Sequence, residues 1–428
     1  MSNANPSPAR AELSIDKTAL ITEGWSASAR LRAADGVLQQ GLPQPRDEYW
    51  KYTRPQSLTQ TTTPSVSHLE EDNGELFADL DVLKLVFVDG IFDAAQSDVA
   101  EDESFDLEML SDVKDVDIHW AGSLYGTLEA KGQTPVPRTL AQYNTAVAEQ
   151  GILLHVKGEV QRPINLIYKR GTSAQSDALL HHTIKIDAGA SVTVLETGPV
   201  GARANIVMEV DLGEGASLNH IRSLGRDAER LSVSHVFARL SSQSQLKSFS
   251  LTMNGALTRH ETVVEINGDD AIAHVAGASV GDRGFHNDDT VFVTHDALRG
   301  ESRQVFKKVL RNGATGVFQG KILVKDGAQK TDGYQISQAL LLDEDSQFLA
   351  KPELEIYADD VACSHGSTSG AIDEDALFYL RARGVPHKTA TNLLTLAFLA
   401  EAVEEIEDAH IAEILVTAIE GWLERRSG

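Results

Sequence analysis

Residues 189–222 read GASVTVLETGPVGARANIVMEVDLGEGASLNHIR, a series of short apolar runs separated by turns. The runs contain many β-branched residues, which is typical of strands. Two related tetrapeptides, GASV at Gly189 and GASL at Gly215, each start a new run after an apolar one. A similar GASV begins at Gly277. Short strands with a weakly recurring turn predict stacked rungs of one elongated body.

The same texture extends from Ile152 to about Tyr357, and no long helical period interrupts it. Further strand-like runs in this region include ILLHV, INLIY, HHTIKI, ETVVEI, TVFVTH and GKILV. An ordinary β-sandwich seldom needs so many consecutive strands. We therefore expect a parallel β-helix or solenoid rather than a sandwich or a barrel.

Helical signals flank this β region. On the N-terminal side, residues 19–40 show helical spacing, Leu83–Val88 predicts a buried strand, and residues 137–151 predict a last helix before the β body. On the C-terminal side, Asp373 is a predicted helix cap, a second helix starts near Thr389, and a third carries the apolar stripe that ends at Trp422 and Leu423. The last two helices predict a hairpin, and the stripe fits either core packing or a docking surface for another protein.

Composition limits the classes of function. The 428 residues are 42% hydrophobic and carry a net charge of -25, which opposes a phosphate-binding surface and thus nucleic acid as a partner. No stretch approaches about twenty apolar residues, and the first ten residues lack the apolar segment of a secretory signal, so we expect a cytoplasmic protein without a membrane partner. One cysteine fits a reducing compartment, and this chain alone cannot hold an all-cysteine iron–sulfur cluster.

Two enzymatic interpretations, a nucleotide-binding enzyme and a carbohydrate-active enzyme, find little support in the sequence. The segment GATGVFQGK (313–321) has Thr315 and Ile322 where a phosphate-binding loop needs Gly and Ser or Thr. Paired acids at 269–270 and 288–289 suggest a carbohydrate-active β-helix enzyme as the alternative function, a polysaccharide lyase or hydrolase. Adjacent strand residues point to opposite faces, so solvated turns are the simpler interpretation of these pairs. The histidines of the β region show no metal-binding spacing and are expected at partly exposed rung positions.

Cys363 and His365 form the one pattern with metal chemistry. If this segment is extended, the two side chains share one face, and a thiolate with an imidazole suits zinc, copper or an iron–sulfur centre. Together they supply at most half of a tetrahedral ligand shell. On spacing alone, a small buried cysteine and a hydrogen-bonded histidine are the simpler explanation of the pair.

Five stretches, in order along the chain, match a known family. They are EYWKYT (48–53), LVFVDGIFDAAQSD (85–98), YNTAVAEQGILLHV (143–156), PELEIYADDVACSHGST (352–368) and DALFYLRARGV (375–385). The chain resembles the SufB/SufD family of the SUF iron–sulfur cluster assembly machinery. The single cysteine and the WKYT segment favour the SufD branch, because SufB chains are typically longer and carry several cysteines. Ser367 stands where the family commonly has Ala.

The resemblance implies a mainly β fold: a right-handed parallel β-helix core (152–366) between an N-terminal helical or α/β region (1–151) and a C-terminal helical domain (367–428). It implies a non-catalytic scaffold that pairs with SufB, docks the ATPase SufC, and passes a transient iron–sulfur cluster to carrier proteins. His365 is expected at the interface with SufB, with Cys363 beside it as a second candidate ligand. The family's complexes are also linked to reduced flavin, for which no contact is placed on this sequence. Whether the chain forms a homodimer without SufB is left open.

The resemblance assigns ATPase docking to the C-terminal helices. The residues expected there are Leu377, Phe378, Arg381, Leu394, Phe398, Ile419 and Trp422. A purely structural adaptor, with no metal role for Cys363 or His365, is the remaining hypothesis.

Overall fold

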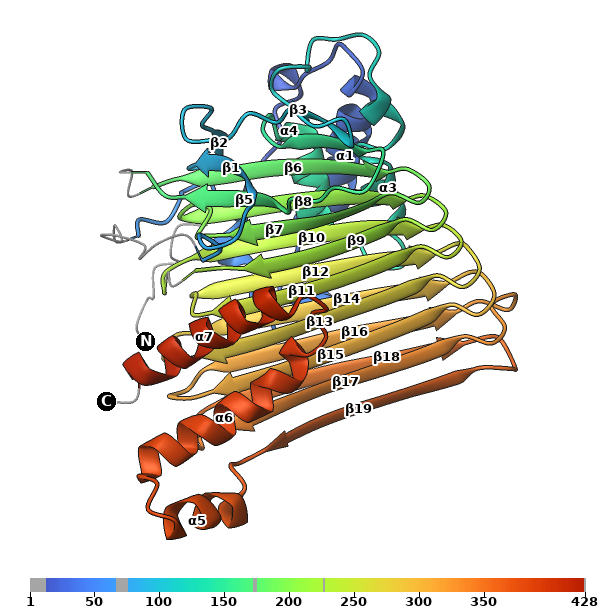
Figure 1. The fold of residues 1–428 in the computed structure, drawn as a ribbon. Helices are drawn as coiled ribbons and strands as arrows, with labels where there is room; N and C mark the ends of the chain where they lie inside the picture. The colour runs from blue at the N-terminus through green and yellow to red at the C-terminus, as the bar shows by residue number, and fades with distance from the viewer. Residues whose placement is uncertain (1–12, 67–75, 172–174, 226–227, 427–428) are drawn as a thin grey trace, which may run out of the picture.

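The body of the molecule is a parallel β-solenoid with two long sheets (Figure 1). The computed structural model describes residues 13–66, 76–171, 175–225 and 228–426. From β4 onward the chain alternates between the sheets, so that even-numbered strands build one sheet and odd-numbered strands build the other. Each strand pairs in parallel with the strand two places further along the chain. The predicted solenoid of stacked rungs is therefore confirmed.

The even-numbered sheet is built from β4 (Ile152–Val156), β6 (Asp177–Ile186), β8 (Arg203–Leu212), β10 (Leu231–Leu240), β12 (Leu257–Ile266), β14 (His286–His295), β16 (Thr315–Val324) and β18 (Gln347–Ile356). The odd-numbered sheet is built from β5 (Ile164–Lys169), β7 (Ser191–Thr197), β9 (Ser217–Ser223), β11 (Gln245–Met253), β13 (Ile272–Gly281), β15 (Glu301–Leu310), β17 (Asp332–Leu341) and β19 (Ala362–Gly370). β1 (Leu83–Val88), β2 (Ile91–Phe92) and β3 (Phe105–Met109) extend the two sheets at the N-terminal end.

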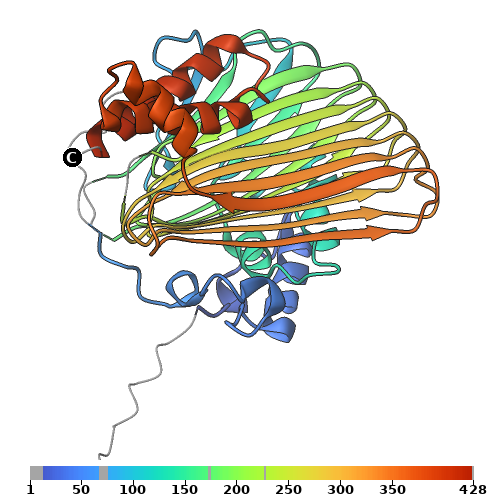
Figure 2. The same ribbon diagram turned by 90° about the horizontal axis from the view of Figure 1, so that it is seen from below.

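The terminal regions cover opposite faces of the solenoid (Figure 2). The N-terminal region comprises η1 (Lys17–Ala19), α1 (Ala27–Gln40), η2 (Glu48–Trp50), α2 (Gln56–Thr59), η3 (Trp120–Ser123), α3 (Thr127–Lys131) and α4 (Thr139–Val147). It packs on the outer face of the even-numbered sheet, through apolar contacts to β10 and β12. The C-terminal helices α5 (Glu374–Ala382), α6 (His387–Val403) and α7 (Ala409–Arg426) follow β19, and α6 and α7 pack on the outer face of the odd-numbered sheet.

The repeating turn of the sequence has a structural counterpart in the register. Ser191 pairs with Ser217, so the spacing of the first two GAS tetrapeptides is one complete rung. Rungs lengthen toward the C-terminal end, where Thr315 pairs with Gln347, and this explains the irregular period. The third copy does not mark a turn, because Gly277 lies inside β13. A Cβ atom there would come within 2.8 Å of the Phe306 ring, so glycine is needed for packing between rungs.

The expected boundary at residue 366 falls within a strand. β19 runs to Gly370, because its ladder with β17 continues to the pair Leu340–Gly370. Asp373 then caps α5 as expected, its side chain accepting from the backbone N–H groups of Asp375 and Ala376 at 2.9 and 3.0 Å. In the part of the chain that the structure describes, no helix is long and apolar enough to cross a membrane.

Candidate functional site

The solenoid ends in an uncovered rung formed by β18 and β19. Each is the last strand of its sheet among the described residues. Residues of both strands are half-buried or exposed, whereas strands inside the solenoid are mostly buried. An edge strand presents backbone N–H and C=O groups that have no partner strand, and such an edge is a template for pairing with another chain. This open end is the candidate site.

Cys363 and His365 both lie on β19, on the face that continues the interior of the solenoid. Cys363 is paired in register with Gly333 and is half-buried beside Ile322, and burial raises the pKa of its thiol. His365 is paired in register with Gln335, and its side chain is exposed at the open end. The structure thus places the two predicted residues on one face of an edge strand. Among the described residues no group of three or more His, Cys, Asp and Glu side chains is placed to hold a metal ion.

Side-chain hydrogen bonds hold β19 in register. The Ser337 and Ser367 hydroxyls lie 2.6 Å apart, and Gln338 Nε2 donates to Thr368 Oγ1 at 3.3 Å. One pair lies on the inner face and the other on the outer face of the sheet. The exposed strand is therefore fixed from both sides, and so are the backbone positions of Cys363 and His365.

The family-like segment EYWKYT reaches the same end of the molecule from the N-terminal region. Tyr49 donates its hydroxyl hydrogen to Glu353 of β18, and the ammonium group of Lys351 lies 3.9 Å from the centre of the Tyr49 ring. Trp50 stacks on Arg259 of β12, at 4.3 Å. The segment spans several rungs and braces β18. The sequence offered no local signal for this role, because some three hundred residues separate Tyr49 from its partner Glu353.

The acidic pairs of the carbohydrate-enzyme alternative have other partners. Asp269 and Asp270 pair with Arg299 at an exposed turn, as the simpler interpretation predicted. The interpretation was wrong for the second pair, because Asp288 and Asp289 are buried in β14. Asp288 forms an ion pair with Arg259 under the N-terminal region, and Asp289 forms one with Lys308 inside the solenoid. The two carboxylates are neutralised on opposite faces of the strand, so they make no joint acid–base site.

The expectation of partly exposed histidines was also wrong for most of the β region. The buried ones are His181, His182, His220, His235, His260 and His295, whereas His274 and His286 are half-buried. Several of them form hydrogen bonds; His220 Nε2, for example, lies 2.7 Å from Glu196 Oε1. Burial lowers the pKa of His182, His235 and His295 to about 4 each. His182, His235 and His295 are therefore uncharged at neutral pH.

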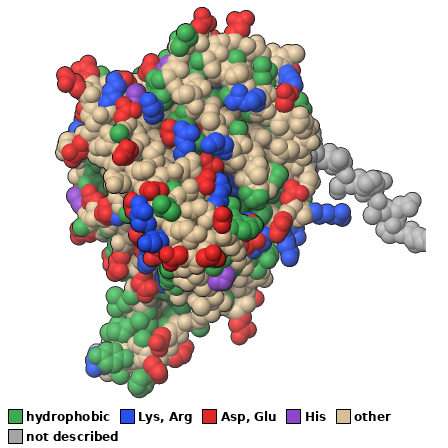
Figure 3. All heavy atoms as spheres, turned by 90° about the vertical axis from the view of Figure 1, so that its right-hand side faces the viewer, with side chains coloured by type: hydrophobic (Ala, Val, Ile, Leu, Met, Phe, Trp, Pro, Cys, Tyr) green, Lys and Arg blue, Asp and Glu red, His purple; other side chains and the backbone are tan. Residues whose placement is uncertain are grey.

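The C-terminal helices separate the expected docking residues into two sets. Leu377, Ile419 and Trp422 are buried, and Leu394 and Phe398 are half-buried. Phe378 is 73% exposed, and Arg381 is exposed near it on α5. Tyr379 and Leu393, which the sequence did not single out, are exposed as well. α5 is the lowest element of Figure 1, and hydrophobic side chains gather on the lowest projection of the molecule in Figure 3.

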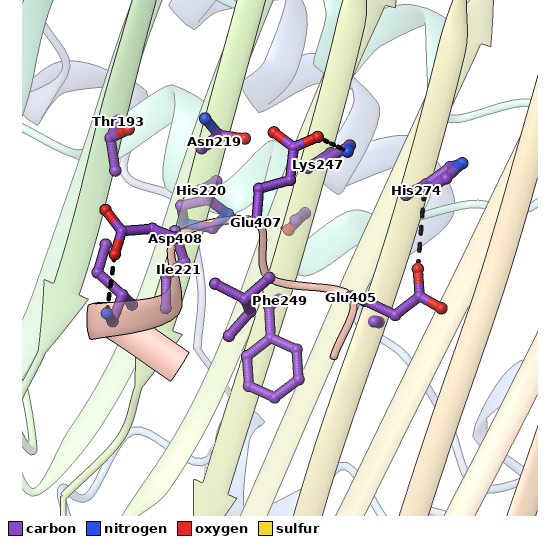
Figure 4. A pocket seen from close by; sticks show the side chains of 14 residues that line it. Thr193, Asn219, His220, Ile221, Lys247, Phe249, His274, Glu405, Glu407 and Asp408 are labelled. Carbon is purple, nitrogen blue, oxygen red and sulfur yellow. Dashed lines mark hydrogen bonds and ion pairs between the residues drawn. The ribbon is translucent and has the colours of Figure 1, made fainter. Parts of the chain in front are cut away.

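A hollow of about 410 Å³, open to solvent, lies where the α6–α7 turn meets the odd-numbered sheet (Figure 4). Its charged side chains are already paired. Lys247 forms an ion pair with Glu407, and Glu405 forms one with Arg303 at 2.7 Å and lies 3.6 Å from His274. Three acidic residues of the turn line it, which does not fit the phosphate of a flavin nucleotide. The charged side chains around the hollow therefore form ion pairs that connect the α6–α7 turn to the solenoid.

Comparison with known proteins gives a consistent group of relatives. A family model described as SUF system FeS cluster assembly, SufBD core domain, matches residues 169–398, more than half of the chain. The iron–sulfur cluster assembly protein SufD of Escherichia coli is 29% identical over 406 residues, which cover 90% of each chain. An iron–sulfur cluster assembly SufBD family protein of Synechocystis is 26% identical over 402 residues, 88% of this chain and 86% of the relative. SufD of Bacillus subtilis is 28% identical over 292 residues, 66% of each chain.

Proposed function

The chain belongs to the SufBD family of the SUF system for FeS cluster assembly, and on this premise we propose that it is a SufD-like scaffold subunit. Its open end pairs with SufB, and a nascent cluster is held between the two subunits before transfer to carrier proteins. The cluster is the cargo of the complex, and the ATPase activity resides in SufC. The observation that carries the proposal is the C-x-H pair on an uncovered edge strand.

His365 is the residue that we assign to the cargo. Its exposed imidazole lies at the open end, within reach of a partner that covers β18 and β19. A half set of ligands is what a shared site requires, because the partner supplies the remaining groups. Cys363 is a weaker candidate, since its sulfur packs against Gly333 and burial raises the pKa of the thiol, which disfavours the metal-binding thiolate.

SufC docking is assigned to the exposed face of α5 and the start of α6. The exposed side chains there are Phe378, Tyr379, Arg381 and Leu393. Aromatic and arginine side chains are enriched at the centres of protein interfaces, where they contribute most of the binding energy. Ile419 and Trp422, the buried members of the expected set on α7, hold the helices on the solenoid and support the docking face indirectly.

The cargo assignment is tested by co-expressing the full chain with SufB and SufC and purifying the complex without oxygen. His365→Ala is expected to leave the complex assembled but without a cluster, measured by visible absorbance and by bound iron and sulfide. Ser364→Ala, on the opposite face of the same strand, is the matched control and keeps the wild-type cluster content. A normal cluster yield from His365→Ala would rule out the assigned role.

Cys363→Ser, measured in the same way, separates a ligand from a neighbour. A cluster content close to that of the wild type would show that Cys363 packs beside the site and is not a ligand of the cluster. Full cluster assembly with both Cys363 and His365 replaced would exclude a metal role for either residue and leave only the hypothesis of a purely structural adaptor.

A further inference from the structure

Two glutamines form a buried ladder directly beneath the last rung. Gln304 of β15 and Gln335 of β17 are paired in register, and both side chains are fully buried inside the solenoid. Gln335 Nε2 donates to Gln304 Oε1 at 2.7 Å. The donor on the later strand thus points back to the acceptor on the earlier strand, as in other stacked amide ladders.

The opposite sheet leaves room for this ladder. Gly320 of β16 faces the interior, and a Cβ atom at that position would lie 2.2 Å from Gln335 Nε2. Any other residue at 320 would displace the amide. Gly320 therefore leaves room for the Gln335 amide. The neighbouring strands contribute the aromatic side chains of Phe306 and Phe318 to the same interior region.

The ladder ends in an unused acceptor. Gln335 Oε1 is buried and has no hydrogen-bond partner within the described structure. Because the Nε2 atom of the same amide is directed at the earlier strand, the oxygen is available to the next strand, which is β19. The residue paired with Gln335 on that strand is His365. Continuing the ladder in the same direction requires a hydrogen-bond donor at position 365, and an imidazole ring N–H is one.

We propose that Gln335 is a positioning residue for His365: its Oε1 accepts a hydrogen bond from one ring N–H and so directs the lone pair of the other ring nitrogen outward. Strand spacing of about 4.8 Å brings the two side chains within reach, and a rotation of the exposed ring completes the contact. Histidine ligands of metals commonly donate their other ring N–H to an oxygen atom, which fixes the tautomer and the ring plane. The functional meaning of this contact rests on the role proposed above for His365.

The test uses the full chain with its histidine rings labelled with ¹⁵N, alone and in the complex with SufB. The His365 signals are assigned by their loss in His365→Ala. In the wild-type complex we expect a single His365 tautomer whose ring N–H exchanges with water about tenfold more slowly than in Gln335→Met, which cannot accept the bond. Gln335→Glu retains an acceptor oxygen and is expected to restore the protected N–H.

The matched control is Gln245→Met, which makes the same chemical change on β11, three strands away from β17 in the same sheet, and is expected to leave the His365 signals unchanged. If Gln335→Met does not fold, the wild-type spectrum still decides, because two interconverting tautomers without a protected N–H in the complex would overturn the proposal. Equal spectra for wild type and Gln335→Met would also overturn it.

Cluster content of the same complexes separates this inference from the proposed function. A protected His365 N–H in the wild type, together with a normal cluster yield from His365→Ala, would support the contact between Gln335 and His365 but contradict the proposed role of His365 in cluster assembly. Loss of cluster in His365→Ala without any effect of Gln335→Met on the tautomer would leave the proposed function in place and remove Gln335 from it.

Discussion

Glu129 is a carboxylic acid in surroundings that favour its protonated form. Its side chain is 1% exposed, and burial together with the nearby Glu209 carboxylate raises its pKa to about 8 from the ordinary value of 4.5. Between these two values the folded state holds the proton and the unfolded state does not. The free energy of unfolding therefore falls as the pH rises from about 4.5 to 8, and this loss is constant above pH 8.

Replacing Glu129 with Gln removes the titration and keeps an oxygen that accepts from Gln133 Nε2. We expect the variant to be more stable than wild type by a margin that grows from pH 5 to pH 8, at up to about 1.4 kcal/mol per pH unit. Urea unfolding at several pH values measures the margin. The control is Glu420→Gln, an exposed change that should show none. A margin for Glu129→Gln that does not depend on pH would contradict the prediction.

The buried histidines predict the opposite dependence at acid pH. His182, His235 and His295, with pKa values of about 4, stay neutral in the folded chain below the ordinary value of 6.5, whereas they become charged in the unfolded chain. Stability should therefore be lost as the pH falls from about 6.5 to 4, by about 1.4 kcal/mol per pH unit for each histidine. His295→Gln should reduce the slope of unfolding free energy against pH by one such contribution. The exposed His387, changed in the same way, should leave the slope unchanged.

At the scale of elements, α5 and α7 present opposite cases of an apolar helix. Trp422 of α7 is 1% exposed, and its Nε1–H donates to Asn254 Oδ1 at 2.9 Å. Together with α6, this helix covers the outer apolar face of β11 and β13, so removing both helices would uncover Phe249 and Leu251. Phe378 of α5, in contrast, leaves 73% of its surface exposed. The apolar stripe of α7 is therefore core, and α5 is the helix that we propose as the docking surface.

Phe378→Ser should therefore weaken binding of SufC without changing the thermal midpoint Tm of the isolated chain. Truncating a buried tryptophan costs about 3–5 kcal/mol, so Trp422→Ala should lower the Tm markedly. Co-purification with SufC and a thermal melt of each variant measure the two effects. Wild-type SufC binding by Phe378→Ser would refute the assignment of this face.

For the whole molecule, the local sequence pattern predicted the architecture correctly but did not predict which polar residues lie in the interior. Short β-branched runs with recurring turns predicted the solenoid because each rung repeats the same local chemistry. The burial of His260 and Asp289 could not be read in the same way. A polar residue in a strand normally signals solvent, but the interior of this solenoid carries a polar seam in which Asp289 pairs with Lys308. The partners of these residues lie on other strands, outside any local window.

The candidate site was likewise predictable from the sequence only in part. The C-x-H spacing correctly placed Cys363 and His365 on one face, since that depends only on extended backbone. Their position on the last strand depends on where the stacking of rungs ends. The contribution of Gln335, which lies a full rung earlier in the chain, depends on register, and register is set by the lengths of the intervening turns.

The open edge of the whole solenoid leads to the last prediction. Alternate residues of a parallel edge strand bond to the inner neighbour. Ala362 N–H donates to Thr331 O at 2.9 Å, so the N–H groups of Cys363, His365, Ser367 and Ser369 point away from β17. Proline at such a position removes an outward donor and spares the inner ladder.

Ser369→Pro is therefore expected to keep the fold and to weaken pairing of this edge with SufB, or with a second copy of the chain where one forms. Ser369→Ala, which keeps the N–H, is the matched control and should pair as wild type does. Sedimentation of the chain alone and mixed with SufB measures the association, and a thermal melt verifies that the solenoid is intact. Undiminished association of a folded Ser369→Pro variant would show that the partner covers the open end through side chains alone, with no strand added to the sheet.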